Sequence, residues 1–134
     1  MGIYVQAFGE KMAVIYSGGE IRNKPSAMSS NVLVLPPVCY PVEVLEKGKE
    51  YFKIKNYQKL TDYIHKSLLK PQPAVIVAAD KVNVRSGPGT NQNVAFQLSQ
   101  GEAARLISSN DGWVEIETAE GQKGWIAELL VWGE

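Results

Sequence analysis

The second half of this 134-residue chain repeats the first half at a nearly constant offset, and this internal repeat limits the possible folds more than any other feature. Arg22 and Pro25 stand 63 residues before Arg85 and Pro88. After a gap of one residue the offset becomes 62, and aromatic positions then match aromatic positions while apolar positions match apolar ones. The matched segments are Val32 with Val94, Val42 with Ala104, Val44 with Leu106, 51–54 with 113–116, and 63–64 with 125–126. The offset predicts two copies of one small fold.

Each copy has the rhythm of short β-strands. Turn signals such as Ser17-Gly18-Gly19 and Asn110-Asp111-Gly112 separate runs in which apolar and polar residues alternate, as in 113–117. The only helix-like stretch, 61–69, matches a strand-like part of the second copy, so the repeat argues against a helix there. Two prolines in 70–73 prevent a strand ladder and mark a linker. The pattern predicts an all-β chain.

Three blocks of the second copy resemble the bacterial SH3 family. They are the segments 82–90, 112–116 and 121–126, which contain an Asn-Val-Arg-Ser-Gly-Pro opening and two Gly-Trp pairs in the family's order. The first copy departs from this pattern, because Asp62-Tyr63-Ile64 stands where the second Gly-Trp block should be. It keeps the hydrophobic skeleton and lacks the glycines. The resemblance implies an all-β fold with two tandem SH3-like small β-barrels, the first of them divergent.

The repeat and the linker also predict the domain boundaries. The divergent barrel should span residues 12–70 and the second barrel 74–134, each with about five strands. Residues 1–11 lie outside the resemblance, and we expect an N-terminal extension or an extra strand there. A barrel of about 60 residues buries little surface on its own, so packing between the two barrels would stabilise both.

Composition excludes several classes of function. Lys plus Arg and Asp plus Glu are both 14, so the zero net charge gives no large basic footprint for nucleic acid or an anionic membrane. With Cys39 as its one cysteine, the chain can form no intramolecular disulfide. No apolar run approaches the roughly 20 residues of a membrane span. Residues 1–8 lack the basic head and cleavage site of a signal peptide. We therefore expect no membrane span.

The sequence offers little for catalysis. Cys39 and His65 are the only cysteine and the only histidine, and no strand-to-helix elbow or helix N-terminus is present near Cys39 to activate a thiolate. No Cys-x-x-Cys pair or histidine cluster suggests a metal, and no phosphate-binding or dinucleotide motif suggests a cofactor. We expect a non-enzymatic protein without cofactor or metal.

A local excess of lysine in the first copy raises the question of nucleic acid. The lysines are Lys47, Lys49, Lys53, Lys55, Lys59 and Lys66. Tyr51, Phe52 and Tyr57 are interleaved with them, as in barrels that bind single strands. Acidic residues of the same strands offset these charges, so the pattern favours a solvated strand face, and no nucleic-acid partner is expected.

Recognition of a peptide or glycan is the best functional interpretation. Alternation places Trp113 on the face opposite Val114, so its ring should be at least partly exposed, and such rings give rigid contact surface. Loop amides could complete a groove with Trp113 or Trp125. The predicted ligand-binding residues are Asn91, Asn93, Trp113 and Trp125. We expect the site in the second copy, since the first has Tyr51 and Tyr63 at the tryptophan positions.

The resemblance implies the ligand class and the location. Family members of this kind suggest cell-wall peptide, peptidoglycan or a partner protein as ligand, in the periplasm or cell envelope, with the cytoplasm left open. Two alternatives stay open: a structural or protein-interaction module with no small ligand, and an accessory targeting fragment of a cell-wall hydrolase. An aromatic groove open to solvent favours a ligand, whereas a groove filled by the other repeat favours the structural module.

Overall fold

The structure is a computed structural model that describes residues 9–134. This part of the chain contains β-strands, short 3-10 turns and no α-helix. The strands of the first half are β1 (Glu10–Val14), β2 (Ile21–Arg22), β3 (Val32–Val34), β4 (Tyr40–Lys47), β5 (Tyr51–Lys55), β6 (Thr61–His65) and β7 (Leu69–Lys70). Those of the second half are β8 (Ala74–Val77), β9 (Lys81–Arg85), β10 (Val94–Ser99), β11 (Ala103–Asn110), β12 (Trp113–Glu117), β13 (Lys123–Ala127) and β14 (Val131–Trp132).

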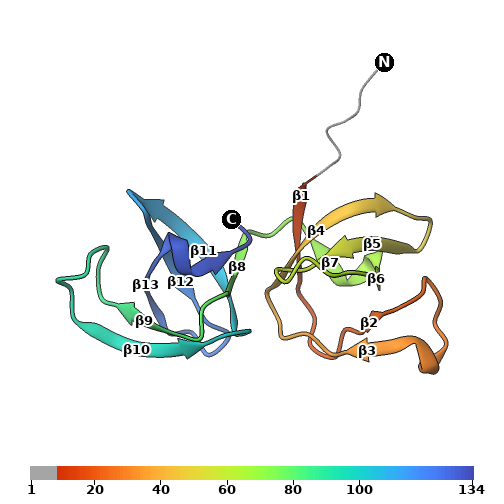
Figure 1. Cartoon of the computed structure of the whole chain (residues 1–134), viewed down its shortest axis with the longest axis horizontal. Helices are drawn as coiled ribbons and strands as arrows, with labels where there is room; N and C mark the ends of the chain where they lie inside the picture. The colour runs from red at the N-terminus through yellow and green to blue at the C-terminus, as the bar shows by residue number, and fades with distance from the viewer. Residues whose placement is uncertain (1–8) are drawn as a thin grey trace, which may run out of the picture.

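The two halves have the same topology. Each forms a seven-stranded antiparallel sheet, in the orders β3-β2-β6-β5-β4-β1-β7 and β10-β9-β13-β12-β11-β8-β14, and the two sheets lie side by side (Figure 1). Strands at the two ends of each order do not pair with each other, so each barrel is open along one seam. The predicted all-β fold of two small barrels is confirmed. Each sheet has seven strands instead of about five because the count includes very short pairings such as β7 and β14.

Backbone hydrogen bonds repeat along with the strands. The amide of Cys39 donates to the carbonyl of Val14 over 2.7 Å, and the amide of Gly101 donates to Val77 over 3.0 Å at the matching place. Cys39 and Gly101 both have positive φ, at 72° and 90°. The first copy has therefore kept the left-handed turn although it lost the glycine, at a cost of about 1 kcal/mol in backbone strain.

The segment that looked helical in sequence is mostly strand. Thr61–His65 forms β6, a single 3-10 turn covers Lys66–Leu68, and Leu69–Lys70 returns as β7. Residues 71–73 have no regular structure, as two prolines require, and β8 starts directly after them. The repeat thus predicted this region better than its local helical pattern did.

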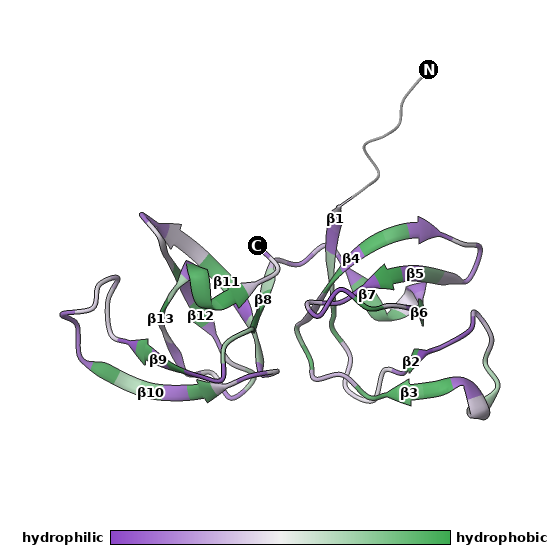
Figure 2. Ribbon diagram, viewed as in Figure 1, coloured by the Kyte–Doolittle hydropathy of each residue, from purple (hydrophilic) through white to green (hydrophobic). Residues whose placement is uncertain are grey.

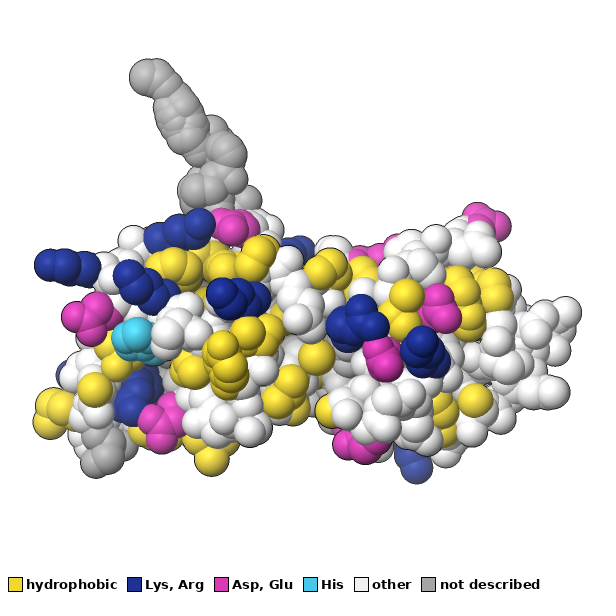
Figure 3. Space-filling model, turned by 180° about the vertical axis from the view of Figure 1, so that it is seen from behind, with side chains coloured by type: hydrophobic (Ala, Val, Ile, Leu, Met, Phe, Trp, Pro, Cys, Tyr) yellow, Lys and Arg dark blue, Asp and Glu magenta, His cyan; other side chains and the backbone are white. Residues whose placement is uncertain are grey.

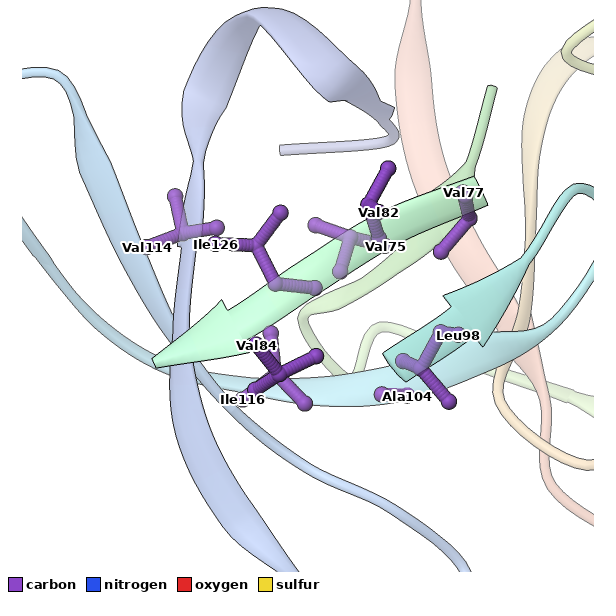
Figure 4. Close-up of a cluster of buried hydrophobic side chains, with 9 residues drawn as sticks. All are labelled: Val75, Val77, Val82, Val84, Leu98, Ala104, Val114, Ile116 and Ile126. Carbon is purple, nitrogen blue, oxygen red and sulfur yellow. The ribbon is translucent and has the colours of Figure 1, made fainter. Parts of the chain in front are cut away.

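The second sheet closes over a compact hydrophobic core. Nine buried side chains from β8 to β13 point toward one another in its centre (Figure 4): Val75, Val77, Val82, Val84, Leu98, Ala104, Val114, Ile116 and Ile126. Buried hydrophobic residues alternate with more exposed ones along β9 and β12 (Figure 2). In the first copy, Ile54 and Ile64 take the places of Ile116 and Ile126 in an equivalent core. Ile54 and Ile116 are both fully buried and face inward.

One strand serves both cores. All four residues of β8 are buried. Val75 and Val77 pack in the second core, whereas Ile76 lies between them in sequence and packs in the first core, with Trp132 against the same cluster. Ala74 joins a smaller cluster with residues of the first copy. The two barrels therefore pack on each other through β8, as their small size predicted.

The N-terminal segment is described only in part. Residues 1–8 lie outside the described residues, so the predicted extension or extra strand at 1–11 can be followed only at its end. Glu10–Val14 forms β1, which pairs with β4 and with β7. The expected domain start at residue 12 therefore falls inside a strand of the first sheet.

Candidate functional site

Two tryptophans lie on the outer face of the second sheet. Val114 is buried, so its neighbours Trp113 and Glu115 on β12 face away from the core. In the pairing of β12 with β13, Trp113 lies opposite Ala127 and Trp125 opposite Glu115. Trp113 and Trp125 are therefore diagonal neighbours on one face, close enough for large rings to interact. Both are half-buried, as predicted for Trp113.

A hollow of about 190 Å³ opens beside Trp113. Its polar lining comes from β9 and the loop that follows it: Lys81, Asn83, Arg85 and Thr90. Three apolar residues of the same copy complete it. Since none of the described residues of the first copy lines this hollow, the described part of the other repeat does not fill it, and the site belongs to the second sheet.

Arg85 holds the loop above this hollow. One guanidinium nitrogen donates to the carbonyl oxygens of Thr90 and Gln92, over 3.1 and 3.0 Å. The matching Arg22 donates in the same way to Ser26 and Met28 in the first copy. Arginine is suited to this task because its planar group can satisfy two carbonyls at once. The repeated arginine therefore fixes the shape of the loop in both copies.

The structure brings together only part of the predicted site. Trp113 lines the hollow, and Trp125 shares its sheet face without lining it. Asn91 and Asn93 are exposed on the loop, where the Asn91 side chain contacts Gln92 and the Asn93 carbonyl accepts from the loop backbone. The two asparagines lie outside the hollow, so their assignment stays a prediction.

Sequence reasoning missed the contribution of β9 to the hollow. Val82 and Val84 are buried, so Lys81, Asn83 and Arg85 share the outward face of that strand. Trp125 of β13 pairs directly with Arg85, which places the β9 side chains beside the tryptophan face. The alternation in 81–85 was the available signal, but the neighbouring strand could be identified only from the sheet order.

The two glycines that precede the tryptophans have different roles. Asp111 and Gly112 form the turn between β11 and β12 with φ values of 48° and 87°, where glycine is favoured. Gly124 instead allows close packing, because a Cβ there would lie 2.5 Å from Cγ1 of Val84. Gly124 therefore permits a close approach to β9, whereas Gly112 serves a left-handed turn.

The charges that line the hollow favour one kind of ligand over others. Its two ionisable lining residues, Lys81 and Arg85, are both cationic. The carboxylates on this part of the sheet have partners: Glu115 accepts from Ser108 over 3.0 Å, and Glu117 pairs with Arg105, which holds the pKa of Glu117 below its usual range. A ligand that offers carboxylate or carbonyl oxygens suits cationic and amide donors beside an aromatic ring.

The first copy has a hollow at the same place with different chemistry. It measures about 370 Å³, and its residues Arg22, Tyr51 and His65 match Arg85, Trp113 and Ala127 of the second copy. The rings of Tyr51 and His65 meet edge to face at 5.1 Å. Glu20, which also lines this hollow, pairs with Arg22, so the lining has both signs of charge.

The lysine-rich strands of the first copy are neutralised locally. Lys55 pairs with Glu43 over 3.7 Å, and Lys53 approaches Glu46 at 3.9 Å. Lys47 pairs with Glu10 over 2.9 Å. These surface pairs match the predicted solvated strand face.

Cys39 and His65 have separate surroundings. The Cys39 side chain is buried beside Gln72, and burial raises the pKa of its thiol. His65 instead lies at the first-copy hollow, where its Nδ1 contacts the hydroxyl of Ser67 at 2.8 Å. A raised pKa keeps the thiol protonated near neutral pH, which disfavours nucleophilic chemistry. Within residues 9–134, no cluster of three or more His, Cys, Asp or Glu side chains is arranged to hold a metal ion.

In the described part of the chain no helix has the length and apolar character needed to cross a membrane.

Comparison with known proteins places the second copy in a family. The model of the bacterial SH3 domain matches residues 78–133. A Bacillus subtilis (strain 168) protein named "Putative N-acetylmuramoyl-L-alanine amidase YrvJ" is 32% identical over 65 residues, which cover 48% of this chain and 12% of that protein. The chain thus spans a small part of this curated relative.

Two solved structures are also similar. NlpC2 from Trichomonas vaginalis has 13% identity and a TM-score of 0.43, over 98% of this chain and 50% of that one. An NlpC/P60 family protein from Bacillus cereus ATCC 10987 has 13% identity and a TM-score of 0.39, over 90% and 55%. The match of the family model covers β9 to β14 of the second sheet and includes both tryptophans of the candidate site. Residues 78–133 therefore belong to the bacterial SH3 domain family.

Proposed function

We propose that this chain is a non-enzymatic binding module of the bacterial cell envelope that recognises cell-wall peptide or peptidoglycan through the second copy. The observation that carries the proposal is the hollow beside Trp113, which is open to solvent and lined by cationic and amide side chains within a bacterial SH3 domain. Peptides of the cell wall offer carboxylates and carbonyls, which are the groups that Lys81, Asn83 and Arg85 can bind. The relative named as an amidase supports the cell wall as the target.

The proposal extends to a role beside a catalytic partner. In a longer protein or a complex with a cell-wall hydrolase, the module would hold the enzyme at its polymeric substrate. Such tethering would raise the effective concentration of the enzyme at the wall, and the apparent affinity of the enzyme for the wall would rise with it.

The test is a sedimentation assay with purified insoluble peptidoglycan. Trp113→Ala should weaken binding about thirtyfold, since truncation of a central aromatic anchor costs about 2 kcal/mol. Tyr51→Ala is the matched control, because Tyr51 occupies the same place in the first copy. Asn83→Ala, which removes a polar group at the same hollow, should weaken binding less.

Thermal unfolding of each variant separates loss of binding from loss of fold. The proposal is wrong if Trp113→Ala binds peptidoglycan as the parent chain does while remaining folded. It is equally wrong if Tyr51→Ala alone abolishes binding, because the ligand would then occupy the first copy.

A further inference from the structure

A further concave surface lies at the junction of the two copies, and its described lining residues differ from those of the two hollows. This junction groove measures about 410 Å³. Its walls come from the segment after β3, including Leu35, and from the β5–β6 turn, including Tyr57 and Leu60. Ile76 and Gly101 of the second copy complete it. In the space-filling view, hydrophobic side chains gather on the first copy and reach the junction (Figure 3).

The exposed leucines of the junction groove are not required by the fold. Leu35 and Leu60 are 60% and 59% exposed. At the matching positions of the second copy stand Gln97 and Gln122, which are also exposed and leave the same topology intact. The repeat thus supplies an internal control, because the scaffold tolerates polar residues at these places. A contiguous exposed apolar patch of this kind marks an interaction surface.

One carboxylate stands in this apolar setting. Among the described residues of the groove lining, Asp62 is the only ionisable acid or base apart from the phenols of the tyrosines. It is half-buried, and no Lys, Arg or His of residues 9–134 forms an ion pair with it. Burial without a compensating cation raises the pKa of Asp62. A cation brought by a partner would relieve this unfavourable burial of charge.

The groove also offers backbone groups. β3 is the terminal strand of its sheet, so among the described strands only β2 pairs with it. Its free side can pair with an extended segment, which is a common mode of peptide recognition. Alternate side chains of an extended segment point to the same face. Such a segment can therefore place apolar side chains in the groove and one charged side chain beside the single acid.

We propose that the junction groove docks an extended segment of a partner protein, with apolar side chains at alternate positions and one Lys or Arg that pairs with Asp62. This interaction is independent of the proposed cell-wall site, because the two surfaces share no lining residue. The chain would then hold a protein partner at one surface and the wall at the other.

The test uses two fluorescein-labelled synthetic peptides with Leu at alternate positions and a central residue that is Lys in one and Glu in the other. Fluorescence anisotropy should show that the Lys peptide binds the full chain more tightly than the Glu peptide. Asp62→Asn should weaken the Lys peptide about tenfold, or about 1.4 kcal/mol, and remove the difference between the peptides. Leu60→Gln installs the residue of the second copy and should also weaken binding.

A matched control is Leu129→Gln, because Leu129 is highly exposed and lies outside the junction groove. It should leave the binding of the Lys peptide unchanged. Equal binding of the two peptides, or equal effects of Leu60→Gln and Leu129→Gln, would overturn the proposal. Self-association seen by sedimentation and lost in Leu60→Gln would also overturn it, because the groove would then bind a second copy of the chain. Thermal unfolding of every variant confirms that the fold is intact.

Discussion

The shared strand β8 makes a specific prediction about stability. Ile76 is fully buried and belongs by sequence to the second copy, yet it packs in the core of the first. Ile76→Ala should therefore open a cavity in the first core from a strand of the second sheet. Because this strand also carries Val75 and Val77 of the second core, the substitution should lower the stability of both halves.

The magnitude follows from the volume removed. The substitution deletes three carbon atoms from a fully buried side chain, which is about 2.4 kcal/mol of lost transfer free energy at about 0.8 kcal/mol per group. The cavity that remains adds to this, so the total should be about 2–5 kcal/mol of unfolding free energy. Ile116→Ala removes the same atoms from the second core alone and is the matched comparison.

The distribution of aromatic residues provides the assay. All three tryptophans lie in the second copy and all six tyrosines precede it. In a Trp132→Phe background, which removes the one tryptophan that packs against the first core, urea unfolding followed by tryptophan fluorescence reports on the second half, and tyrosine fluorescence reports on the first. We expect the two transitions to coincide in the parent chain and to move together in Ile76→Ala and in Ile116→Ala.

The reasoning is refuted if Ile76→Ala shifts the tyrosine transition while the tryptophan transition stays in place. The two halves would then unfold independently, and β8 would not couple them. A loss below about 1 kcal/mol in both signals would show that the first core closes around the deleted atoms.

Three further predictions concern single residues. Gly124→Ala should destabilise the chain by about 1–3 kcal/mol in urea titrations, because the new Cβ would overlap the side chain of Val84. Burial raises the pKa of the Cys39 thiol above its ordinary value of 9.0, so the stability that the protonated thiol provides is complete below pH 9 and is lost as the pH rises further. Cys39→Ser should therefore reduce the loss of stability at alkaline pH in urea titrations. It should leave peptidoglycan binding unchanged. Arg85→Ala removes the charged group that donates to two loop carbonyls. The free energy of local opening at the Ser86 amide should then fall by about 1.5 kcal/mol, so this amide should exchange its hydrogen faster, while the midpoint of global unfolding changes little.

The sequence predicted the fold well because the repeat compares each residue with a counterpart in the same environment. Ile54 and Ile116 could be placed in their cores from alternation alone, and Trp113 could be placed on the opposite face. The helix-like pattern at 61–69 was outweighed because its counterpart in the second copy is strand-like. Local periodicity therefore sufficed where one face of a strand is buried and the other is not.

It failed where burial depends on how the two copies pack. The run 74–79 is apolar throughout, and such a run does not indicate which side chain enters which core. Only the packed structure shows that Ile76 faces away from Val75 and Val77. The junction groove escaped prediction for the same reason, since the sequence pattern does not show that Leu35 is exposed where the two copies meet.

The shared strand also fixes the geometry between the two hollows. Two domains on a flexible linker sample many separations, so a polymer that binds one finds the other at an average concentration set by linker length. In this chain residues 71–73 form too short a linker for the two copies to move apart, and β8 is buried on both sides. The separation between the two hollows is therefore not averaged. A polymer that contacted both hollows would have to present its groups at one fixed spacing, whereas binding through Trp113 alone places no such requirement on the polymer.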